Sequence, residues 1–85
     1  MRTLFIGSTK RGYQTLSALI DHRANIVGVI SLRQDEHEKD RYEEPIRRLA
    51  GRQDIPLYET RWMKDRPYPE IIAREIRPDL IVVVA

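Results

Sequence analysis

Apolar residues fall into two kinds of run that alternate along the chain. Four short runs, at 3–6, 25–30, 55–58 and 80–85, are nearly continuous and rich in β-branched residues. Three segments between them, at 13–22, 45–51 and 69–77, carry apolar residues at helical spacing. Continuous short runs are typical of strands, and a spacing of three or four residues is typical of helices. The pattern therefore predicts the order β-α-β-α-β-α-β.

Strict alternation of strands and helices is typical of a parallel sheet with right-handed crossovers and helices on both faces. The runs at 26–30 and 80–85 are apolar throughout, as expected for strands that are covered on both sides. We predict an α/β fold, an open doubly wound (Rossmann-like) parallel sheet. Residues 1–85 would form the N-terminal part of one domain, the first half only of such a sheet.

The final segment, RPDLIVVVA, places six apolar residues at 80–85 with no helix after them. This strand would return beside the first strand, with nothing to cover it. Uncovered apolar strands pair readily with other chains. We therefore expect the chain to be incomplete, and the isolated 85-residue chain to self-associate.

Composition and charge narrow the possible partners and the compartment. The longest apolar run is far shorter than the roughly 20 residues of a membrane span, so no membrane partner is expected. The chain has no cysteine, which excludes a disulfide scaffold and a thiolate metal site and fits the cytoplasm. The net charge of +2 is spread without a basic stripe and selects no partner by itself.

The fold predicts where a ligand site would lie. Ligands of doubly wound sheets bind at the carboxyl ends of the strands, where the strand order reverses. Here that point lies between the loop after Ile6 and whatever follows Ala85. The loop, GSTKRG at 7–12, lacks the middle glycine of a dinucleotide motif, and the second strand closes on Ser31 instead of a carboxylate. Two interpretations stay open: a loop for an anion or polar substrate, or an ordinary turn capped by Ser8 or Thr9.

Other chemistry-bearing residues favour structural roles. His22 ends the first helix at the wrong edge of the sheet, and His37 lies at the correct edge but lacks metal-ligand spacing. Trp62 is interpreted as a packing anchor. Three arginines are assigned to the solvated face of the second helix: Arg47, Arg48 and Arg52.

Four stretches in register carry a family resemblance: LFIGSTKRGYQTLSALI, IVGVISLRQDEHE, IRRLAGRQDIPLYET and REIRPDLIVVVA. Together they resemble the N-terminal half of the formyltransferases that use 10-formyltetrahydrofolate. That family includes methionyl-tRNA formyltransferases and sugar N-formyltransferases. The resemblance covers essentially the whole chain.

The resemblance implies that the intact protein moves a formyl group from 10-formyltetrahydrofolate to a primary amine. The family's catalytic asparagine, histidine and aspartate lie beyond the fourth strand, so it implies no catalytic residue within this chain, which would be inactive alone. It assigns Gly7, Ser8 and Thr9 to a substrate-binding loop. Ala85 would be the last residue before the loop that binds the folate.

Two sequence differences from the tRNA-acting members of the family bear on which amine accepts the formyl group. Ser8 follows the first glycine where those members usually carry a Thr-Pro pair. Residues 32–44 hold three basic and six acidic side chains, a net charge of −3 that would repel a phosphate backbone. Both favour a small amine, such as a nucleotide-linked amino sugar, with methionyl-tRNA next. Two alternatives stay open: a nucleotide- or cofactor-binding module of another doubly wound enzyme, and a non-catalytic interaction domain.

Overall fold

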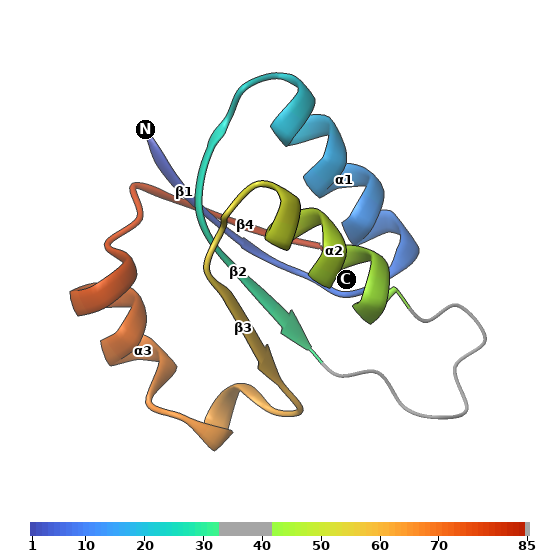
Figure 1. Cartoon of the computed structure of the whole chain (residues 1–85). Coiled ribbons are helices and arrows are strands. Elements are labelled where there is room, and N and C mark those ends of the chain that lie inside the picture. The colour runs from blue at the N-terminus through green and yellow to red at the C-terminus, as the bar shows by residue number, and fades with distance from the viewer. Residues whose placement is uncertain (33–41, 85) are drawn as a thin grey trace.

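Four parallel strands form one sheet in the computed structural model, which describes residues 1–32 and 42–84. The strands are β1 (Arg2–Ile6), β2 (Asn25–Leu32), β3 (Leu57–Thr60) and β4 (Leu80–Val83). Their order across the sheet is β3-β2-β1-β4, so β4 returns beside β1 (Figure 1). The predicted doubly wound α/β fold and its strand order are confirmed.

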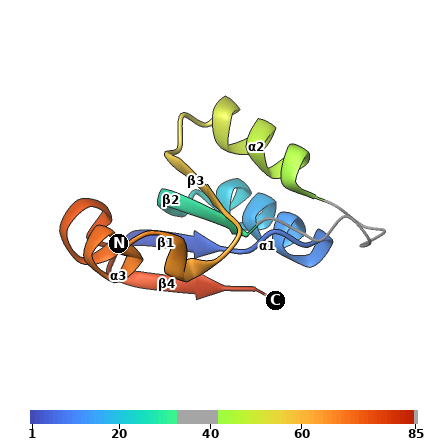
Figure 2. The ribbon, with the colours of Figure 1, turned by 90° about the horizontal axis from the view of Figure 1, so that it is seen from below.

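Helices cover both faces of this sheet. The helices are α1 (Lys10–Asp21), α2 (Glu43–Arg52) and α3 (Tyr68–Ile71), which a π-helical segment, Ile72–Ile76, continues. A single 3-10 turn, Met63–Asp65, precedes α3. Figure 2 shows α2 and α3 on opposite sides of the sheet. Because alternate residues of a strand point to opposite faces, β1 and β2 must be apolar on both.

Two apolar clusters fill the space between sheet and helices. On the α1 and α2 face the buried residues are Phe5, Leu16, Ile26, Val29, Ile46 and Leu49. On the α3 face they are Leu4, Ile6, Ile30, Tyr68 and Ile76. Strand β1 alternates between the clusters, with Phe5 in one and Leu4 and Ile6 in the other. The continuous apolar run of β2 is covered on both sides, as predicted.

Strand β4 lies uncovered at the edge of the sheet, as the position of the last apolar run beside the first strand predicted. In the described part of the chain it pairs with β1 and has no strand on its other side. Leu80, Ile81 and Val83 are 46%, 45% and 68% exposed. The apolar run at 80–83 is therefore an open edge, whereas β2 lies inside the sheet.

Several element boundaries differ from the pattern-based prediction. Helix α1 begins at Lys10, three residues early, because the side chain of Thr9 caps it: Thr9 Oγ1 accepts from the N–H of Gly12 at 3.1 Å. Helix α2 begins at Glu43, so Pro45 is its third residue and not its first. A proline is tolerated there because the first N–H groups of a helix have no intrahelical partner. Strand β3 begins at Leu57, after Pro56.

The end of the third helical segment is tied to the start of β1. Arg77 has a left-handed φ of 52°, and the helix stops before Pro78, as predicted. The Arg2 guanidinium donates to the carbonyl oxygens of Ile76 and Arg77. The backbone N–H of Arg2 donates to Asp79 Oδ2 at 2.8 Å. One arginine thus satisfies the last carbonyls of the helix and fixes where β4 begins.

Candidate functional site

The loop after β1 lies where the strand order reverses. The N–H of Gly7 donates to the carbonyl of Ile30 at 3.0 Å, and the N–H of Val84 donates to the carbonyl of Ile6 at 2.9 Å. The loop therefore sits between the carboxyl ends of β2 and β4. This is the position that the element order predicts for a ligand site.

The backbone that follows β4 approaches Gly7 closely. A Cβ atom at this position would lie 3.0 Å from the carbonyl oxygen of Val84 and 3.1 Å from Cζ of Phe5. Among the described glycines none has a positive φ, so backbone conformation does not explain the residue. The absence of a side chain lets the backbone end of β4 come against the loop.

Ser8 and Thr9 have different surroundings. Thr9 is the N-cap of α1, so the capping interpretation is confirmed for this residue. Ser8 is buried, and its hydroxyl has no hydrogen-bond partner within residues 1–32 and 42–84. This hydroxyl can donate one hydrogen bond and accept others, so it is available to a polar ligand at the loop. A substrate role for Gly7, Ser8 and Thr9 stays a prediction.

Two of the predicted positions lie outside the described residues: Ala85, assigned to the folate side, and His37. His22 is the C-cap of α1 and is exposed. It lies at the amino end of the strands, away from the loop after β1, as predicted.

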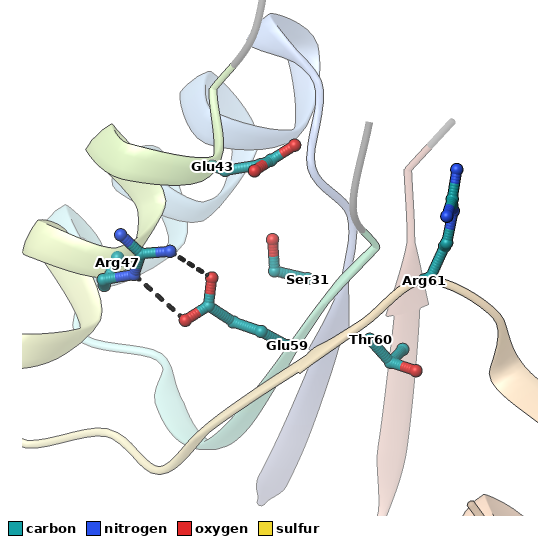
Figure 3. A pocket seen from close by; sticks show the side chains of 6 residues that line it. All are labelled: Ser31, Glu43, Arg47, Glu59, Thr60 and Arg61. Atoms are coloured by element: carbon teal, nitrogen blue, oxygen red, sulfur yellow. Dashed lines mark hydrogen bonds and ion pairs between the residues drawn. The ribbon is translucent and has the colours of Figure 1, made fainter. Parts of the chain in front are cut away.

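A cavity of about 250 Å³ lies at the carboxyl ends of β2 and β3, beside the N-terminus of α2 (Figure 3). Its lining residues are Ser31, Glu43, Arg47, Glu59, Thr60 and Arg61. Sequence reasoning did not predict this cavity. It depends on the pairing of β2 with β3 and on the placement of α2, neither of which a linear pattern contains.

Arg47 joins helix α2 to strand β3 across one wall of the cavity. Its Nε donates to Glu59 Oε1 at 3.0 Å and its Nη2 donates to Glu59 Oε2 at 2.6 Å. Its Nη1 donates to Glu44. The bond and charge of Glu59 raise the pKa of Arg47, so the guanidinium keeps its charge. Arg47 is exposed, as predicted for the solvated face of the helix, but its fixed position was not foreseen.

The interpretation of Trp62 as a packing anchor is wrong. Its side chain is 57% exposed, in the turn that follows β3. Polar bonds hold this turn instead. The hydroxyl of Thr60 donates to the carbonyl of Trp62 at 2.8 Å, and the N–H of Trp62 donates to Asp65 at 3.2 Å. The turn therefore does not need the indole for its shape.

Two further features concern residues 1–32 and 42–84: side chains that could hold a metal ion, and helices that could cross a membrane. No cluster of three or more His, Asp or Glu side chains there could hold a metal ion. Likewise, none of the helices it contains has the length and apolar character to cross a membrane.

The strand order places the chain among doubly wound α/β proteins, and the loop after β1 lies where ligands bind in folds of this kind. No protein-family model matches the chain. The chain is similar to a methionyl-tRNA formyltransferase from Geotalea daltonii, with 36% identity over 91 aligned positions. The alignment covers 100% of this chain and 28% of the relative, so the chain spans less than a third of that enzyme. This similarity supports the formyltransferase family and nothing narrower.

Proposed function

We propose that this chain is the N-terminal part of a formyltransferase that moves the formyl group of 10-formyltetrahydrofolate to a primary amine. The observation that carries the proposal is the 36% identity to a formyltransferase across the whole chain. The sheet order and the family resemblance of the four sequence stretches support it. An enzyme of this kind would act in the cytoplasm.

Formyl transfer needs groups that the described residues do not bring together. The amine attacks the formyl carbon, a base accepts the amine proton, and donors stabilise the oxyanion of the tetrahedral centre. His22, the histidine within the described ranges, lies at the far edge of the sheet. The catalytic asparagine, histidine and aspartate of the family would therefore come from segments after β4. The chain alone would be inactive.

The role proposed for this chain is to form one side of the site. Gly7, Ser8 and Thr9 would face the substrate, and Ala85 would lead into the folate pocket. The close approach of Gly7 to Val84 supports this role, because it brings the loop against the end of β4. The hydroxyl of Ser8, a residue with little exposed surface, can donate to or accept from a polar substrate.

The acceptor amine has two candidates, each with its own support. The similar protein is a methionyl-tRNA formyltransferase, which favours methionyl-tRNA. The net charge of −3 over residues 32–44 disfavours contact with RNA, and this favours a small amine such as a nucleotide-linked amino sugar.

Calorimetric titration of the full-length protein tests the proposal. We expect 10-formyltetrahydrofolate to bind at one site, and the reading frame to continue past Ala85 with an Asn-x-His motif. Binding of NAD or ATP without any binding of the folate would overturn the proposal. That result would favour a cofactor-binding module of another doubly wound enzyme.

A further inference from the structure

Ser31 and Glu59 are paired positions on neighbouring strands. The parallel register of β2 and β3 aligns Ser31 with Glu59. Their side chains lie on the face that α2 covers, because Val29 and Leu57, two residues earlier on each strand, pack in the α1 and α2 cluster. A hydroxyl and a carboxylate are therefore neighbours at the carboxyl end of the sheet.

The hydroxyl of Ser31 is directed into the cavity and has no hydrogen-bond partner among the residues that the structure describes. The residue is only 2% exposed, yet it lines the cavity, and Figure 3 shows its oxygen pointing from the sheet toward Glu43. Within residues 1–32 and 42–84 this hydroxyl makes no hydrogen bond. The hydroxyl faces the open cavity, so a polar ligand or water there can form its hydrogen bonds.

Glu59 is held in place with acceptor capacity to spare. Each of its oxygens accepts one N–H from Arg47, and a carboxylate oxygen can accept two. The bidentate contact fixes the plane of the carboxylate. The free lone pairs of Glu59 can therefore receive hydroxyl donors of a ligand without movement of the side chain.

The charge and size of the cavity favour a neutral ligand with hydroxyl groups. Among the described residues, its lining carries two carboxylates, Glu43 and Glu59, and two guanidinium groups, Arg47 and Arg61, so the formal charge of these side chains is zero. A volume of about 250 Å³ is below the range of about 300 to 1,000 Å³ typical of pockets for drug-sized molecules. One sugar ring fits this description better than an isolated anion or a metal ion.

We propose that this cavity binds the vicinal diol of a ribose, with Ser31 and Glu59 as its hydrogen-bonding pair. Many doubly wound folds hold a ribose hydroxyl with a carboxylate near the end of the second strand. This chain has Ser31 there, and the carboxylate comes from the paired position on β3. The ribose could belong to a ribonucleoside or to a free riboside. The residues that line this cavity differ from those of the loop after β1, and the proposed ribose binding does not depend on formyl transfer.

Protein-observed NMR titration of the full-length protein tests this site with three ligands: adenosine, 2′-deoxyadenosine and methyl β-D-ribofuranoside. We expect adenosine to shift the amide signals of Ser31 and Glu59. The 2′-deoxy compound should bind at least about tenfold more weakly, which corresponds to about 1.4 kcal/mol. Shifts with the riboside as well would assign recognition to the sugar, and shifts with adenosine alone would assign it to a nucleoside.

Two variants and two matched controls complete the test. Ser31→Ala and Glu59→Gln should each weaken adenosine binding at least about tenfold. Ser17→Ala on α1 and Glu75→Gln at the other end of the sheet should leave it unchanged. Thermal unfolding checks that each variant folds. If Glu59→Gln unfolds the protein because the contact with Arg47 is lost, the binding measured with Ser31→Ala is the test. Equal binding of adenosine and 2′-deoxyadenosine, unchanged binding by Ser31→Ala, or no binding at all would overturn the proposal.

Discussion

Two glycines show how a single Cβ atom can have opposite effects in this fold. At Gly7 a Cβ would lie 3.0 Å from the carbonyl oxygen of Val84 and press on the ring of Phe5. At Gly51, in helix α2, a Cβ would have no described atom within 4 Å apart from its chain neighbours and the backbone of its own helix. Gly7→Ala should lower the free energy of unfolding by about 1–3 kcal/mol through overpacking. Gly51→Ala should raise it by about 0.5–1 kcal/mol, because alanine is the better helix former.

Urea unfolding of the two glycine variants measures both changes. Opposite signs support the close approach of β4 to the loop after β1. Equal stabilisation by both substitutions would show that Val84 does not lie against Gly7.

Tyr68 buries a hydroxyl that has no partner within the described ranges. Its ring is fully buried in the α3-face cluster. Tyr68→Phe removes the desolvated hydroxyl and keeps the ring, so the free energy of unfolding should stay the same or rise by about 1 kcal/mol. Chemical denaturation measures the change. A loss above about 1 kcal/mol would mean that the hydroxyl is bonded in the folded protein.

For single residues, the sequence predicted some structural roles and missed others. Residue type and position limited the cap of α1 to Ser8 or Thr9, and the structure selects Thr9. The exposure of Trp62 does not, because the polar bonds of Thr60 and Asp65 that hold its turn depend on three-dimensional geometry. The pairing of Ser31 with Glu59 needs the strand register, which the apolar pattern does not contain.

A side-chain hydrogen bond at its N-terminus stabilises helix α1 in addition to hydrophobic packing. The side chain of Thr9 satisfies the N–H of Gly12, one of the donors that a helix start leaves open. Thr9→Ala should lower the free energy of unfolding by about 1 kcal/mol and increase amide hydrogen exchange in the first turn. Thr15→Ala is the matched control, since the hydroxyl of Thr15 only donates back to the carbonyl of Arg11 within the helix. Equal losses for both variants would contradict the capping role.

Element order was predictable because it depends only on the alternation of strand and helix patterns. The boundaries were less predictable, for identifiable reasons. Helix α1 begins earlier than predicted because Thr9 caps it. Strand β3 begins later than predicted, after Pro56, which has no N–H to donate. The end of the π-helical segment Ile72–Ile76 is bonded to Arg2, which is 75 residues away from Arg77 along the chain.

The open edge of β4 bears on whether the isolated chain self-associates. Leu80, Ile81 and Val83 are exposed there, beside backbone groups that no described strand pairs. The 85-residue chain should therefore self-associate, and Val83→Lys should shift it toward monomer because a charged edge residue opposes pairing. Trp62→Lys replaces another exposed apolar residue away from this edge and should not. Sedimentation velocity gives the readout, and a monomeric unsubstituted chain would contradict the prediction.

The central claim concerns the reaction of the intact protein, and single-turnover formyl transfer tests it most directly. The full-length protein is mixed with 10-formyltetrahydrofolate and either methionyl-tRNA or a nucleotide-linked amino sugar, and formylated product is measured by mass spectrometry. We expect one of the two amines to be formylated and the isolated 85-residue chain to form no product. Absence of formylated product with both amines would contradict the claim.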